Sequence, residues 1–125
     1  MERLKALVLE KIGDEEFSHW FNKYTGKLKF VVYQGMPEMD KDIANLDLSV
    51  RPYNCLKRAG YDTINSFVND IEHMEDLSRI RHMGRKSMYE VMAKLFIYTY
   101  ENLKPQKRKS YLDMTMEMNS SEVSV

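Results

Sequence analysis

The chain has 125 residues, 19 basic against 19 acidic side chains, and one cysteine. This length allows one domain, or a small domain with a substantial extension. The single cysteine, Cys55, excludes an intrachain disulfide framework and fits a reducing compartment. No apolar run is long enough to cross a membrane, so we expect a cytoplasmic protein.

The charge is unevenly distributed along the chain. Residues 46–109 carry twelve Lys and Arg against eight Asp and Glu, a net charge of +4, whereas the segments before and after are weakly acidic. This value is far below that of strongly basic nucleic-acid binders. If residues 46–109 bind a nucleic acid, we expect the binding to be weak and sensitive to salt.

Two helices are predicted near the N-terminus. Apolar residues at helical spacing indicate a helix over residues 2–12, and Asp14 is a candidate N-cap for a second helix that begins at Glu15. The second helix carries an aromatic stripe at positions i, i+3, i+4 and i+7, made of Phe17, Trp20, Phe21 and Tyr24. This stripe is either core or, if the short segment cannot bury it, a protein-interaction surface or a dimer seam.

One possible strand follows, over residues 27–34. Its sequence, KLKFVVYQ, is rich in β-branched and aromatic residues. A lone strand would need a hairpin mate or a second copy of the protein. The Gly- and Pro-containing stretch after it is typical of a linker, which places a boundary near residues 36–44.

The following part is predicted to be a compact run of helices. Ser49 and Thr63 are candidate N-caps, Gly60 is a stop signal, and Pro105 follows a helix end. The expected helices cover residues 50–59, 64–71, 75–80 and 85–103. We therefore predict a mainly α fold with three parts: residues 1–43, a helical segment with its linker; residues 44–104, a compact helical bundle; and residues 105–125, a disordered tail.

Two sequence blocks within the bundle point to function. LDLSVRPYNCLKRAG and LSRIRHMGRKSMYEVMAKL each put basic and small polar residues at the start of a helix. Helix N-termini carry unpaired N–H groups and a partial positive charge, so they attract anions. Two such helix starts in one small unit favour a nucleic-acid clamp over a catalyst.

In this order and at this separation, the blocks resemble the C-terminal domain of the bacterial RNA polymerase alpha subunit. The resemblance rests on Leu46–Lys57 and on Met83–Val91, and it covers roughly residues 44–96. It implies a bundle with a helix–hairpin–helix element that binds the minor groove of A·T-rich double-stranded DNA and contacts activators and sigma factors. No large assembly domain accompanies the module, so we expect a stand-alone protein.

The resemblance also implies which residues contact DNA. Arg51 corresponds to the arginine that enters the minor groove, and the glycine and the residues after it would approach the phosphates. The implied DNA-binding residues are Arg51, Asn54, Cys55, Lys57, His82, Gly84, Arg85, Lys86, Ser87 and Glu90. His82 stands where the family usually has Asn, and Pro52 and Tyr53 replace smaller residues. The arginines at positions 58, 79, 81 and 85 add positive charge that could compensate for these changes.

The N-terminal sequence KIGDEEFSHWFNKY is similar to the start of the interaction domain of the replication initiator DnaA. That likeness implies that residues 1–35 bind protein rather than DNA. No nucleophile–base pair, nucleotide loop or histidine pair with metal-ligand spacing is visible, so we expect neither an enzyme nor a cofactor or metal site.

The sequence therefore predicts a nucleoid-associated, DNA-binding accessory protein of transcription. The alternative is an adaptor that binds RNA polymerase, a sigma factor or an activator through the same module. Either protein could form a homodimer.

Overall fold

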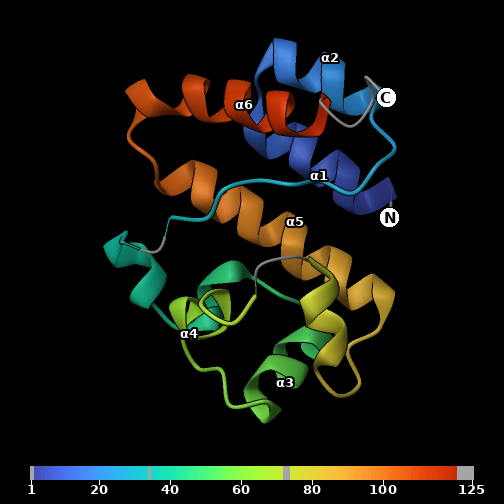
Figure 1. Ribbon diagram of the computed structural model, residues 1–125, viewed down its shortest axis with the longest axis vertical. Coiled ribbons are helices and arrows are strands. Elements are labelled where there is room, and N and C mark those ends of the chain that lie inside the picture. Colours follow the sequence, from blue (N-terminus) through green and yellow to red (C-terminus); the bar gives the residue numbers. More distant parts are fainter. Residues whose placement is uncertain (1, 34, 72–73, 121–125) are drawn as a thin grey trace. The chain divides into compact units, whose positions relative to one another are not determined.

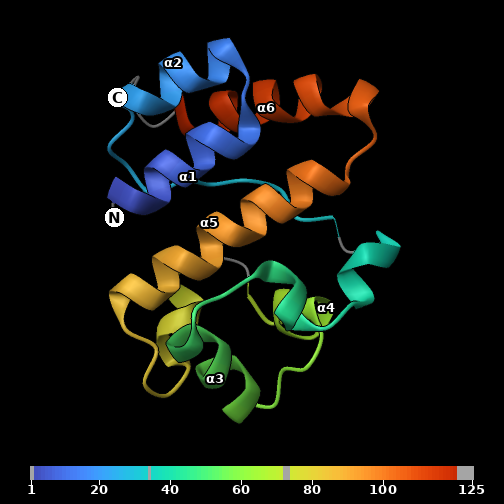
Figure 2. The same cartoon turned by 180° about the vertical axis from the view of Figure 1, so that it is seen from behind.

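The computed structural model describes residues 2–33, 35–71 and 74–120, which form helices connected by turns and extended segments (Figure 1 and Figure 2). These residues divide into two compact units. The central unit comprises Tyr33–Leu95, and the terminal unit combines Glu2–Val32 with the residues from Phe96 onward. The predicted mainly α fold is confirmed. None of the helices in the described ranges is long and apolar enough to span a membrane.

The central unit is built from short helices around an apolar core. The core is formed by buried residues that include Met39, Ile43, Leu56, Phe67, Leu77 and Val91. Its elements are η1 (Pro37–Asp40), η2 (Ile43–Leu46), α3 (Val50–Arg58), α4 (Ile64–Val68), η3 (Met74–Arg79) and the first part of α5 (Arg85–Asn102). The ends of α3 and α5 agree with prediction to within one residue. Thr63 caps α4 as expected, because its Oγ1 accepts the Ser66 N–H at 3.1 Å.

The terminal unit contains α1 (Glu2–Ile12), α2 (Glu15–Lys23), the second part of α5 and α6 (Pro105–Ser120). Both α1 and α6 pack against α2, and both views show these three helices together (Figure 1 and Figure 2). The predicted cap of α2 is present, since the Asp14 carboxylate accepts the Phe17 N–H at 2.9 Å.

The aromatic stripe of α2 forms the core of the terminal unit. The Phe17 side chain is completely buried, and its ring centroid lies 5.7 Å from that of Phe96. Phe96 in turn stacks on Tyr111 of α6 at 5.9 Å. Phe17 and Phe21, predicted as candidate protein-interaction residues, are thus core residues. Trp20 and Tyr24 are half-buried. The correction follows from partners beyond residues 1–35: Phe96 of α5 stacks on Phe17, and α6 packs against α2.

Residues 105–120 were expected to belong to a disordered tail, but they form α6. Pro105 occupies the first helical position, where its missing N–H costs no hydrogen bond. The buried residues of α6 recur near helical spacing and are Tyr111, Leu112, Thr115 and Asn119. A sequence that is polar on average therefore carries one face that packs into the core. Residues 121–125 lie outside the described ranges.

The predicted strand over residues 27–34 is wrong for the described residues 27–33, which are extended but lie in no sheet. Side chains of α6 take the place of a partner strand. The Asn119 amide donates from Nδ2 to the Lys29 carbonyl and accepts the Lys29 N–H at Oδ1, both at 2.9 Å. The Tyr111 hydroxyl donates to the Val31 carbonyl at 2.6 Å. Gln34 lies outside the described residues.

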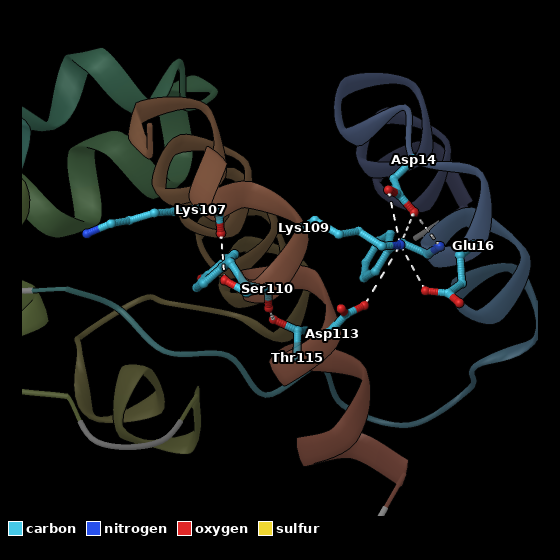
Figure 3. Close-up of polar contacts among 9 residues, drawn as sticks. Asp14, Glu16, Lys107, Lys109, Ser110, Asp113 and Thr115 are labelled. Atoms are coloured by element: carbon cyan, nitrogen blue, oxygen red, sulfur yellow. Dashed lines mark hydrogen bonds and ion pairs between the residues drawn. The ribbon is translucent and has the colours of Figure 1, made fainter. Parts of the chain in front are cut away.

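A charged cluster joins α6 to the start of α2 at the surface. The Lys109 ammonium lies 2.8 Å from Glu16 and 3.4 Å from Asp14, with Asp113 of its own helix at 3.8 Å (Figure 3). The hydrogen bond to Glu16, followed by that to Asp14, raises the pKa of Lys109. Exposed ion pairs of this kind stabilise a fold only slightly, so the aromatic core and Asn119 carry more of the packing.

We predict that Asn119→Ala destabilises the protein by about 1–3 kcal/mol, because it removes two part-buried hydrogen bonds to the Lys29 backbone, each worth about 0.5–1.5 kcal/mol. Urea unfolding followed by circular dichroism measures the change. Asn102→Ala is the matched control, since the Asn102 amide donates only to Tyr98 of its own helix. Equal losses in the two variants would contradict the structural role of Asn119.

Candidate nucleic-acid interface

Side chains of α5 form hydrogen bonds with residues 47–49, the segment that leads into α3. The Ser49 N–H donates to Glu90 Oε2 at 2.5 Å, and the Ser49 hydroxyl donates to Glu90 Oε1 at 2.7 Å. One turn further along α5, Lys94 donates to the carbonyl of Asp47 and lies 3.9 Å from its carboxylate. Residues four apart share one face of a helix, so Glu90 and Lys94 together fix the start of α3 against α5.

Glu90 accepts the N–H of the N-cap residue Ser49, a role that no residue of α3 can take. In a capping box, a Glu at the third helical position accepts the N–H of the N-cap residue. In α3 that position holds Pro52, so the carboxylate comes from another helix. The Ser49 hydroxyl is directed to Glu90 and gives α3 no side-chain cap. The first turn of α3, which carries Arg51, is therefore anchored to α5 through its N-cap residue, Ser49.

A second junction joins α3 to the turn before α5. The Cys55 thiol donates to the His82 carbonyl at 3.4 Å. His82 has a φ of 68°, in the left-handed region, and Met83 beside it is buried. These constraints reverse the chain sharply and start α5 at Arg85. The side chain of His82 remains exposed next to α3.

A groove of about 630 Å³ runs along α3 from its first residue to its last and is closed by His82. We call it the Arg51 groove; its lining residues are Val50, Arg51, Asn54, Cys55, Arg58 and His82. No lining residue is acidic. The groove thus brings together Arg51, Asn54 and His82, three of the residues predicted from the sequence, in a setting suited to a polyanion.

The start of α5 supplies a further exposed set among the predicted residues. Gly84, Arg85 and Lys86 are all exposed. They stand at the N-terminus of an 18-residue helix, where N–H groups without intrahelical partners and the helix dipole favour an anion. Both the helix N-terminus and the basic side chains therefore favour an anion at this position.

The remaining predicted residues are buried or already have partners. Cys55 and Ser87 are buried, at 3% and 7% exposure. Glu90 accepts from Ser49, and the Lys57 ammonium lies 3.0 Å from Asp42 and 3.3 Å from Asp62. In the described structure these four residues are therefore not presented as free groups for a ligand.

Sequence reasoning missed the roles of Ser49, Asp47 and Lys94. Ser49 was assigned as an N-cap only, although its partner Glu90 lies 41 positions further along the sequence. The spacing of Glu90 and Lys94, one turn apart on α5, was the available signal. Among the residues the structure describes, no group of three His, Cys, Asp or Glu side chains could hold a metal ion.

The family comparison picks out the same part of the protein that carries the Arg51 groove and the helix starts. Residues 33–96 match the family of C-terminal domains of the bacterial RNA polymerase alpha chain. This protein belongs to that family. The matched range coincides, to within one residue, with the central unit, so the central unit is the alpha C-terminal domain of this protein. The resemblance predicted from the sequence is confirmed.

The relatives include alpha subunits of DNA-directed RNA polymerase from Bacillus velezensis, Oceanobacillus iheyensis and Heliobacterium modesticaldum. Each is 53% identical to this protein over 57 residues, which make up 46% of the length of this protein. The aligned part spans only 18% of the length of each relative. No solved structure shows significant similarity to the protein.

The ion pair between Lys57 and Asp42 can be tested through the pKa of the Asp42 carboxyl group. The Ala44 N–H, followed by the Lys57 ammonium, holds the pKa of Asp42 below its usual value. We predict that Lys57→Met moves the pKa of Asp42 part of the way back up, since the Ala44 hydrogen bond remains. NMR titration of the carboxyl carbons measures the shift, with Lys41→Met as the control. An unchanged pKa in Lys57→Met would show that the ion pair is absent in solution.

The pH dependence has a fixed sign. Because the pKa of Asp42 is lowered in the folded state, its stabilising contribution is present above the ordinary Asp pKa. It is lost as the pH falls through the folded-state value. The pair is exposed and screened by solvent, so the effect on unfolding is small and the titration is the sensitive readout.

Proposed function

We propose that the alpha C-terminal domain of this protein binds double-stranded DNA, with Arg51 in the minor groove of A·T-rich sequence and the start of α5 on the phosphate backbone. The observation that carries the proposal is the Arg51 groove, where exposed cationic and polar side chains meet without an acidic residue. The relatives are subunits of a DNA-directed RNA polymerase, which favours the same ligand.

Arg51 suits minor-groove contact. It is exposed in the first turn of α3 and has no acidic partner among the described residues. A·T-rich DNA has a narrow minor groove with enhanced negative potential, which attracts a guanidinium. Asn54 lies one turn further along the same groove and can donate to a sugar or phosphate oxygen.

The start of α5 suits a phosphate. Gly84 has no side chain to obstruct a close approach, and nothing lies within 4 Å of where its Cβ would stand. The amides that follow it and the Lys86 ammonium can then donate to one phosphate group. Contacts of this kind set the register of the protein on the duplex and leave sequence preference to Arg51.

The role that fits is a non-catalytic accessory protein of transcription. With a net charge of +4 over residues 46–109, the domain would bind DNA weakly alone and gain affinity from a second copy or from RNA polymerase, a sigma factor or an activator. Nucleoid association would follow from DNA binding. Phe17 and Phe21 of the aromatic stripe are buried, so these two residues are not available to a homodimer interface.

We predict that Arg51→Ala weakens binding to an A·T-rich duplex by roughly 5- to 150-fold, the loss expected for one specific groove contact. Fluorescence anisotropy at fixed salt measures the affinity. Lys57→Ala is the matched control and should change it by less than about 3-fold, because Lys57 is already paired with Asp42 and Asp62.

Equal affinities of the wild type and Arg51→Ala would refute the assignment of Arg51. A wild-type protein that binds no duplex, yet retains RNA polymerase from a nuclease-treated bacterial lysate, would establish the adaptor function instead.

Glu90 allows a test that depends on the sign of the effect. If Glu90 acted only through its charge, its removal near a polyanion would strengthen DNA binding. Because Glu90 holds Ser49 at the start of α3, we predict that Glu90→Ala weakens binding. Glu90→Gln keeps one accepting oxygen and should fall between the wild type and Glu90→Ala. Tighter binding by both variants would contradict the positioning role.

A further inference from the structure

A second groove, of about 640 Å³, continues from the Arg51 groove. The two grooves share Cys55, Arg58 and His82 in their lining. The second groove runs past the end of α3 toward η3 and the turn before α5, and it adds Arg79 and Arg81. We call it the Arg81 groove. Arg58 thus lines both grooves of the alpha C-terminal domain.

The acidic residues of the Arg81 groove already have partners. Asp70 accepts the Tyr61 hydroxyl at 2.7 Å, and this hydrogen bond, with burial, raises the pKa of Tyr61, so the donor stays protonated. Asp76 lies 3.6 Å from the guanidinium of Arg79. Arg79 therefore compensates the charge of Asp76, whereas Asp70 keeps its negative charge and is engaged by a neutral donor.

Two arginines of the groove have no such partner. Arg58 and Arg81 are both exposed, and neither forms an ion pair with any residue that the structure describes. His82, which lies between the two grooves, is also exposed. After local pairing, the Arg81 groove has an excess of positive charge concentrated at Arg58 and Arg81.

The spacing along α3 suits a nucleic-acid backbone. Arg51 and Arg58 are seven positions apart, so they lie on the same face of the helix, two turns from each other. With a rise of about 1.5 Å per residue, they are separated by roughly 10 Å along the helix axis. Two guanidinium groups this far apart can contact one duplex at two separate points, Arg51 in the groove and Arg58 on the adjacent backbone.

We propose that the Arg81 groove is a phosphate-binding extension of the DNA surface, in which Arg58 and Arg81 contact the backbone of the duplex that Arg51 enters. This inference rests on the proposed DNA binding. A guanidinium binds a phosphate through two parallel hydrogen bonds, so both arginines can neutralise phosphates without reading bases. The extension gives this protein two additional phosphate contacts and compensates for its low net charge.

The test is the salt dependence of DNA binding by the full-length protein. Each phosphate contact lowers the slope of log affinity against log salt concentration by about 0.9. The double variant Arg58→Ala/Arg81→Ala should reduce the steepness of that slope by about 1.8 units. It should weaken binding equally for A·T-rich and G·C-rich duplexes, whereas Arg51→Ala should reduce the preference for A·T-rich DNA. Circular dichroism verifies that each variant is folded.

The control is Arg3→Ala/Lys11→Ala, which removes two exposed charges from α1 in the terminal unit. It should leave the slope nearly unchanged, and Arg58→Lys/Arg81→Lys should retain most of the wild-type slope. A slope that is unchanged in Arg58→Ala/Arg81→Ala, or reduced equally in the control, overturns the extension alone if Arg51→Ala still weakens binding. A wild-type protein that binds no duplex overturns both proposals.

Discussion

The two hydrogen bonds from Ser49 to the Glu90 carboxylate are the contact on which the candidate interface depends. They join residues 41 positions apart and bring the starts of α3 and α5, the two anion-attracting helix ends, into one surface. A carboxylate near a DNA-binding surface is electrostatically unfavourable, so its presence requires a structural reason. The reason is Pro52, which occupies the position in α3 from which a local Glu would otherwise cap the helix.

The pairing of charges, more than their number, determines where the protein can meet a polyanion. Lys57, Lys94 and Lys109 each lie within 4 Å of at least one carboxylate, so their charge serves the fold. Arg51 and Arg58 have no acidic partner in the part of the sequence that the structure describes, and they line a groove without acidic residues. A protein whose net charge is zero can thus present a locally cationic face. Composition alone indicates only the small excess over residues 46–109.

The helices were predictable because their signals are local. Periodicity and the caps Asp14 and Thr63 lie within a few residues of the helices they define, and both caps are present. The family resemblance that points to Arg51 and Asn54 likewise rests on a short block, and both residues line the Arg51 groove. The extended segment and α6 were not predictable, because the Asn119 amide pairs with Lys29 from 90 positions away. Local propensity indicated a strand, and it could not show that side chains of α6 would take the place of a partner strand.

The second part of α5 belongs to the terminal unit and packs into the aromatic core of that unit. The family match ends at residue 96, yet α5 continues to Asn102. Phe96 is completely buried, in contact with Phe17, Phe30 and Tyr111 of the terminal unit. Without these rings, the continuation of α5 would expose a large aromatic side chain to water, at a cost of about 1.5–3 kcal/mol. The second part of α5, the stripe of α2 and the buried face of α6 therefore depend on one another, because they form one core. None of the three could have been assigned a structural role from the family resemblance, because the residues that form this core lie toward both ends of the sequence.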